Sequence, residues 1–161
     1  MANAIFLKLE GADGECTDEA HKEEINVQSF SWGVANTATM ESGQGVSAGK
    51  AVAMELSFSK LIDTSSSVLI KRCASGKTFP TGTLSIQRAG GEKVQALVIK
   101  LTNVYVSSYQ IGDSQGSGML PTENVSLSYD KVDFIYTKQK EDGAKDAERD
   151  AGYDLKANTV T

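Results

Sequence analysis

Residues 51–76 contain the feature that most limits the fold, a strand pattern that changes abruptly into one short helix. Val52, Met54, Leu56 and Phe58 alternate with small or polar residues. This period of two is typical of a strand whose sheet is buried on one face, because successive side chains of a strand point to opposite sides. The sequence therefore predicts a strand over residues 52–59.

The second part of this stretch has the markers of a single helix. Residues 63–67 offer several N-caps, whose side-chain oxygens can accept the unpaired amide hydrogens of a helix start. Lys71 and Arg72 place positive charge in the expected last turn, and Gly76 is suited to a left-handed stop. The predicted apolar stripe of the helix consists of Leu69, Ile70, Cys73 and Ala74.

Most of the remaining chain has strand patterns separated by turn residues. The apolar phase shifts by one residue within 24–34 and again within 123–136, which predicts a β-bulge in each or, in the second, a tight turn at residues 130–131. Gly- and Ser-rich composition predicts loops at 37–50 and 112–118. The other expected strands cover residues 5–9, 81–88, 94–101 and 104–111.

These strands predict a mainly β fold, a small antiparallel barrel or sandwich with one helix. The strand patterns at 95–111 and 123–136 are longer than a small barrel requires. Long open sheet edges promote aggregation unless another strand pairs with them. Pairing between identical subunits would remove that hazard, so the sequence predicts an oligomer built through its sheets.

Length and composition narrow the class of protein further. The 161 residues predict a single domain, 1–161, with a charged C-terminal segment at 139–161. A formal net charge of −5 argues against a nucleic-acid partner, since phosphate binding needs clustered Lys and Arg. We expect no membrane insertion, because no apolar run approaches the roughly 18–20 residues of a transmembrane helix. The N-terminus lacks a signal-peptide pattern, so we expect folding in the cytoplasm and export, if any, by another route.

No group of residues forms a convincing catalytic, cofactor or metal site. The glycines at 43–49 suggest a phosphate-binding loop, but that loop needs a helix after it and a strand pattern follows instead. A metal site of His21, Glu23 and Cys16 lacks the ligand spacing of zinc sites, and a solvated loop explains His21 more simply. We therefore expect a protein that is not an enzyme, without catalytic residues, cofactor or metal.

Three further side chains are assigned to structural roles. Spacing alone permits a disulfide between Cys16 and Cys73, but nothing resembles a disulfide framework, so both are expected as free thiols. Phe30 and Trp32, beside Gly33, are expected in the core rather than as a stacking platform.

Several segments together resemble the haemolysin-coregulated proteins, Hcp, of bacterial type VI secretion systems. The resemblance covers nearly the whole chain, and the order and spacing of its pieces make it specific. The pieces are HKEEINVQSFSWG at 21–33, LSFSKLID at 56–63, SGK at 75–77, QRAGG at 87–91, ENVSLSY at 123–129, and GYDL at 152–155 with Asn158.

The resemblance implies an antiparallel two-sheet β-barrel with one short α-helix that assembles as a hexameric ring. Rings would stack into a tail tube, tipped by a spike protein, fired by a contractile sheath and able to hold small effector proteins in the lumen. The chain would be cytoplasmic before firing and secreted afterwards. The main alternative is a monomeric small-ligand-binding β-barrel, which predicts an apolar cavity.

Within this framework, alternation and loop placement suggest two groups of functional residues. Polar residues on the second strand, Gln28, Ser29 and Ser31, are the lumen-facing candidates. The candidates for contacts between rings or subunits are Met40, Glu41, Ser42, Gly43, Gln44 and Gly45 in one loop and Ala89, Gly90 and Gly91 in another.

Overall fold

The computed structural model describes residues 3–41, 43, 45–89 and 94–161. The elements are mostly strands, with a 3-10 turn η1 and one α-helix α1 among the described residues. In chain order they are β1 (Ala4–Leu9), η1 (Glu19–His21), β2 (Ile25–Val27), β3 (Ser29–Ser31), β4 (Val34–Glu41), β5 (Gly45–Ala53), β6 (Leu56–Leu61), α1 (Ser66–Ser75), β7 (Phe79–Gln87), β8 (Gln95–Gly112), β9 (Thr122–Ser128), β10 (Lys131–Gln139), β11 (Lys145–Asp154) and β12 (Thr159–Val160).

Two antiparallel sheets share the long strand β8, which has 18 residues. The first sheet has the order β12-β11-β10-β8-β7-β1-β2, and the second has the order β3-β6-β9-β8. The first half of β8 pairs with β7 and β10, and residues 105–112 pair with β9. The change of sheet falls at Asn103, which has a φ of 54° and donates a side-chain hydrogen bond to Asp130 Oδ2 at 2.6 Å.

The predicted fold is confirmed as mainly β, with two antiparallel sheets and one helix. The strand order of the described residues does not record a closed barrel, because β2 pairs with β1 in one sheet and β3 pairs with β6 in the other. The chain changes sheets at Gln28 between them. The hexameric ring is a property of several copies and is treated below as a proposal.

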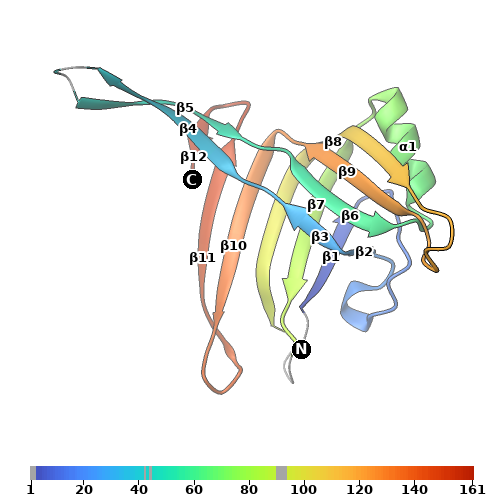
Figure 1. Ribbon diagram of the computed structural model, residues 1–161. Helices are drawn as coiled ribbons and strands as arrows, with labels where there is room; N and C mark the ends of the chain where they lie inside the picture. Colours follow the sequence, from blue (N-terminus) through green and yellow to red (C-terminus); the bar gives the residue numbers. More distant parts are fainter. Residues whose placement is uncertain (1–2, 42, 44, 90–93) are drawn as a thin grey trace.

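The core lies between the two sheets and is built by inward-facing alternate residues of the strands. Leu56 and Phe58 of β6 and Val125 and Leu127 of β9 follow the period of two and are buried. Phe30 and Trp32 are half-buried and pack against this core, as predicted. Helix α1 lies beside β8 at one side of the molecule and adds Leu69, which is fully buried (Figure 1).

Helix α1 begins and ends close to the predicted residues, but the residues on its buried face differ from those predicted. Gly76 has a φ of 72° and donates its N–H to the Arg72 carbonyl at 2.9 Å, closing the last turn. Ile70 is 46% exposed and Ala74 is exposed, so their assignment to the buried stripe was wrong. Leu69 and Cys73, four residues apart, share the inner face, and the residue after each of them turns outward.

Several predicted boundaries were also wrong. Residues 37–50 are not a loop but most of the β4–β5 hairpin, and the predicted strand 52–59 is interrupted at Met54 and Glu55. Residues 24–34 and 123–136 are not single bulged strands, because each is divided between the two sheets. Within 123–136 the strand breaks after Ser128 and resumes at Lys131, close to the tight turn predicted as the alternative, but the two strands join different sheets. The strands predicted at 94–101 and 104–111 form one strand, β8 (Gln95–Gly112), and the tail contains β11 and β12, which we did not predict.

Candidate assembly surfaces

The β4–β5 hairpin is a two-stranded ribbon that projects away from the two sheets (Figure 1). Its tip holds the first group of predicted contact residues. Met40 pairs with Val46 and Glu41 with Gly45, while Gly43 and Gly45 have φ values of 95° and 82° that the turn requires. Ser42 and Gln44 lie outside the described residues. The structure therefore places this candidate loop at the end of an extended arm.

The base of the hairpin is fixed to the body by hydrogen bonds around Tyr129. The Tyr129 hydroxyl donates to the Met54 carbonyl at 2.6 Å and accepts from Trp32 Nε1 at 2.5 Å. The Tyr153 hydroxyl lies 3.3 Å from the Ala51 carbonyl. Among the described residues, β4 and β5 pair only with each other, and an isolated two-stranded hairpin is only marginally stable in water.

Polar side chains cover the outward face of the second sheet. Ser29 and Ser59 are 2.5 Å apart at their hydroxyl oxygens, and Ser57 and Ser126 are 3.0 Å apart. A shallow groove of about 240 Å³ runs over this face, and none of its lining side chains is charged. We call this surface the hydroxyl face; its polar members are Ser29, Ser31, Ser57, Ser59, Ser108, Gln110, Asn124 and Ser126.

The lumen-facing candidates are only partly brought together. Ser29 and Ser31 lie on the hydroxyl face and are exposed. Gln28 sits at the change of sheet, where its N–H donates to the Ser59 carbonyl at 2.8 Å, and it lines a different groove with Ile62 and Leu120.

The second predicted contact loop lies between β7 and β8. Ala89 is exposed, and the preceding Arg88 donates its backbone N–H to the Val94 carbonyl at 3.1 Å. The Arg88 side chain also approaches the Tyr136 hydroxyl at 3.3 Å. Gly90 and Gly91 lie outside the described residues.

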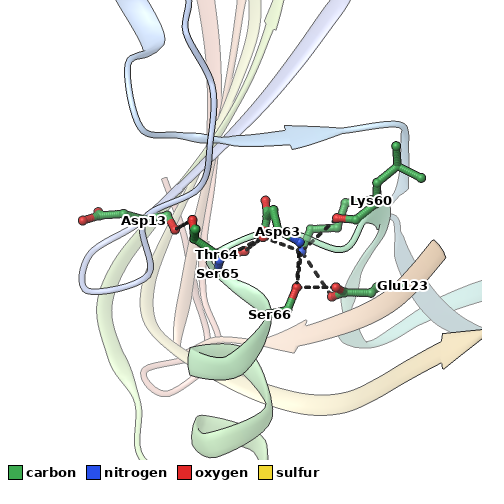
Figure 2. A network of polar contacts seen from close by, with 8 residues as sticks. Asp13, Lys60, Asp63, Thr64, Ser65, Ser66 and Glu123 are labelled. Carbon is green, nitrogen blue, oxygen red and sulfur yellow. Dashed lines mark hydrogen bonds and ion pairs between the residues drawn. The ribbon is translucent and has the colours of Figure 1, made fainter. Parts of the chain in front are cut away.

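A buried polar cluster joins the start of α1 to the second sheet (Figure 2), and the sequence analysis did not find it. Lys60 and Glu123 are both fully buried and face each other on the paired strands β6 and β9, with Lys60 Nζ 3.1 Å from Glu123 Oε2. Lys60 also donates to Asp63 Oδ1 at 2.8 Å and to Ser66 Oγ at 3.1 Å. Ser66 in turn donates to Glu123. The available signal was the alternation itself, which places Lys60 and Glu123 in inward register on their strands.

This cluster is structural in character. A serine beside a lysine can form a nucleophilic pair, but Ser66 is buried and already accepts from the Asp63 N–H at 3.0 Å. Asp63 also accepts from the Ser65 N–H at 2.9 Å and so stabilises the helix start. Tyr109 is a titratable residue next to this cluster. Its pKa is raised from 10.0 to about 12, mainly by burial and secondly by the Glu123 carboxylate.

The prediction that His21 lies in a solvated loop was wrong, because His21 is buried. Its ring stacks on Phe6 with centroids 4.0 Å apart. Nδ1 lies 2.8 Å from Glu24 Oε2, and Nε2 lies 2.7 Å from Gln95 Nε2. Both ring nitrogens are therefore engaged in holding the segment before β2 against the first sheet. Cys16 and Cys73 are free thiols, as predicted.

A groove on the first sheet does not match the apolar cavity that the small-ligand alternative predicts. It is a groove of about 710 Å³ whose lining includes Thr83, Lys100, Lys145 and Glu148. Thr83 and Lys100 alternate with the buried residues Leu84, Ile99 and Leu101 of β7 and β8 and so lie on the outer face of the first sheet. No helix within the described ranges is long and apolar enough to span a membrane.

Comparisons with known proteins agree with this architecture. The chain matches the model of the family described as type VI secretion system effector, Hcp, over residues 6–136. Protein hcp1 of Pseudomonas aeruginosa is 45% identical over 147 residues, which cover 91% of this chain and 90% of that protein.

Two solved structures support the same assignment. The structure of a type six secretion system protein superposes with a TM-score of 0.95 at 36% identity, covering 99% of this chain and 100% of the other. Hcp1 from Salmonella typhimurium superposes with a TM-score of 0.82 at 35% identity, covering 100% of both chains. With the shared two-sheet fold and the sequence match over most of its length, this chain belongs to the Hcp family of structural, secreted type VI secretion proteins.

Proposed function

We propose that this chain is the tail-tube subunit of a type VI secretion system and has no catalytic role. Six copies form a ring, rings stack into the inner tube, and a contractile sheath propels the tube with its spike out of the cell. The chain is cytoplasmic before firing and is found outside the producing cell afterwards. This proposal rests on family membership and on the surfaces described above.

The observation that carries the ring is the pair of open edges of the second sheet. Within the described residues, β3 pairs only with β6, and residues 105–112 of β8 pair only with β9. Each edge leaves backbone N–H and C=O groups without strand partners. Pairing β3 of one copy with residues 105–112 of the next satisfies both edges, and repetition of this head-to-tail contact closes a ring.

The hydroxyl face lines the lumen of the proposed ring. It belongs to the same sheet whose edges would join, so ring closure would carry it around one continuous wall. Ser29 and Ser31 are the proposed lumen residues from β3, and small effector proteins are the proposed cargo. An uncharged wall would hold such cargo through hydrogen bonds and shape rather than through charge.

The projecting hairpin mediates contacts between stacked rings. Its tip, Met40 to Gly45, extends away from the sheets and has no partner within its own chain among the described residues. The loop at Ala89, with Gly90 and Gly91, is proposed as a second contact on a ring face.

Electron cryomicroscopy of the purified, assembled chain tests this proposal. We expect rings of six copies in which β3 lies beside residues 105–112 of the neighbour and Ser31 faces the lumen. A ring joined through other edges would contradict the proposed contact, and a monomeric particle would contradict the tube function itself.

A further inference from the structure

One row of apolar side chains on the inner face of the first sheet is left uncovered by the second sheet within the described residues. Direct cross-strand pairs join these side chains across β1, β7, β8 and β10, and we call them the open row: Ile5, Ile86, Leu97 and Tyr136. Tyr136 is 39% exposed, and the other three are partly buried. The next row along β1, β7 and β8 is completely buried, at Leu7, Leu84 and Ile99. The second sheet therefore covers the first sheet only as far as that buried row.

Strand β3, an edge of the second sheet, borders the open row. Trp32 follows β3 and stacks on Phe134, with ring centroids 6.1 Å apart. Phe134 lies two residues before Tyr136 on β10, and the two line a groove of about 500 Å³ together with Ile86 and Leu97. Figure 1 shows the strands of the first sheet continuing past β3 toward the N-terminus. Grouped apolar side chains on a surface mark a site of interaction.

Helix α1 lies along the opposite edge of the second sheet, residues 105–112 of β8. The helix begins at Ser66, close to Tyr109 of that edge. It ends before Gly76, where an added Cβ atom would lie 3.7 Å from Tyr105. Leu69 of the same helix packs into the core, so α1 lies on the core side of the second sheet, away from the hydroxyl face.

The outward face of α1 is apolar at its centre. Ile70 is 46% exposed and Ala74 is exposed, and residues four apart share one face of a helix. In the proposed ring, β3 of one copy lies beside residues 105–112 of the next. This joint brings the next copy's α1 to the open row, because the helix flanks one of the joined edges and the row borders the other. Both lie on the core side of the second sheet.

We propose that the outward face of α1, at Ile70 and Ala74, docks on the open row of the adjacent copy in the same ring. This inference rests on the proposed tube function and names a second contact at each ring joint. Strand β3 has only three residues, so backbone pairing along it supplies few hydrogen bonds. Burial of the open row under a helix adds the hydrophobic contribution that such a short pairing lacks. Each copy has one helix and one open row, so the contact repeats around a closed ring.

Cross-linking across the proposed contact tests the inference. All variants carry Cys73→Ser, and Cys16 is kept because it is buried. The test variant adds Ile70→Cys and Tyr136→Cys and is treated with a short bis-maleimide. We expect a ladder on a denaturing gel that ends at six chains. The matched control pairs Ile70→Cys with Ile135→Cys, the neighbouring position on the outer face of β10, and is expected to give no ladder.

Two results would overturn the inference. A test variant that cross-links no more than the control shows that α1 does not dock on the open row. A ladder that extends beyond six chains places the contact between rings instead. Native mass spectrometry of the same samples and of the parent chain separates the two proposals. Rings without a ladder contradict only the docking, whereas single chains in the parent contradict the tube function as well. A folded test variant that loses its rings while the control keeps them supports the contact at Tyr136.

Discussion

Lys60 and Glu123 show how a single buried pair fixes this fold. Each charge is removed from water, and the pair compensates this through a 3.1 Å contact and through the hydrogen bonds of Asp63 and Ser66. The attraction of a buried pair often only balances the desolvation of its members, but a single remaining buried charge is strongly destabilising. The pair therefore makes the register of β6 and β9 depend on both residues.

Removing one member of this pair should cost far more stability than removing both. We expect Lys60→Met or Glu123→Leu alone to lower the free energy of unfolding by about 3–5 kcal/mol, and the double variant to recover most of the loss. Denaturant unfolding at one fixed protein concentration measures this cycle. Lys131→Ala, in the partly exposed pair with Asp133, is the matched control and should cost no more than about 1 kcal/mol. Additive losses in the double variant would refute the coupling.

Tyr109 makes the stability of the folded protein depend on pH above about 10. Its pKa is raised from 10.0 to about 12, so the folded protein retains the tyrosine proton more strongly than the unfolded chain. The resulting stability is fully present below pH 10 and is lost as the pH rises toward 12. We expect Tyr109→Phe to reduce the fall in Tm over this range, measured by thermal unfolding from pH 9 to 12. An unchanged slope would show that Tyr109 does not contribute.

At the scale of elements, the β4–β5 hairpin depends on one close backbone contact. A Cβ atom added at Gly49 would collide with the carbonyl and hydroxyl oxygens of Thr37, where the hairpin register shifts. We expect Gly49→Ala to distort the hairpin and abolish ring stacking, while rings form and the core stability is kept. Negative-stain microscopy for tubes, with native mass for rings, measures both properties.

The control for this change is Gly112→Ala, since a Cβ atom there meets nothing within 4 Å in its own chain and alanine keeps the backbone N–H and C=O groups of the proposed ring edge. This variant should stack like the parent chain. Normal tubes from Gly49→Ala would mean that the hairpin geometry does not determine stacking.

The elements also show which parts of the structure could be predicted from sequence. The helix and the core strands were predictable because their apolar periods and caps are local signals. The changes of sheet at Gln28 and Tyr129 were not, because a period of two tells which face is buried but not which strand is the partner. The hairpin was mistaken for a loop because its Gly-rich sequence lacks a buried face of its own.

The candidate assembly residues also divide into those indicated by a local sequence pattern and those brought together only by the fold. Ser29 and Ser31 could be predicted as exposed because they alternate with the half-buried Phe30 on one strand. The other members of the hydroxyl face come from β6, β8 and β9, so only the folded sheet brings them together. The buried state of His21 depends on Gln95, 74 residues away, and no local pattern indicates that contact.

At the scale of the whole molecule, every assembly surface proposed here requires identical copies. The open edges of the second sheet would pair around a ring, the hydroxyl face would line its inside, and the hairpin would connect one ring to the next. The function is then mechanical, and its strength comes from backbone pairing repeated around the ring.

The mass of the assembled particle tests this account most directly. Native mass spectrometry or sedimentation of the purified chain should give a particle of about six times the 17.1 kDa chain mass. A folded protein that remains a single 17.1 kDa chain at every concentration measured would contradict it.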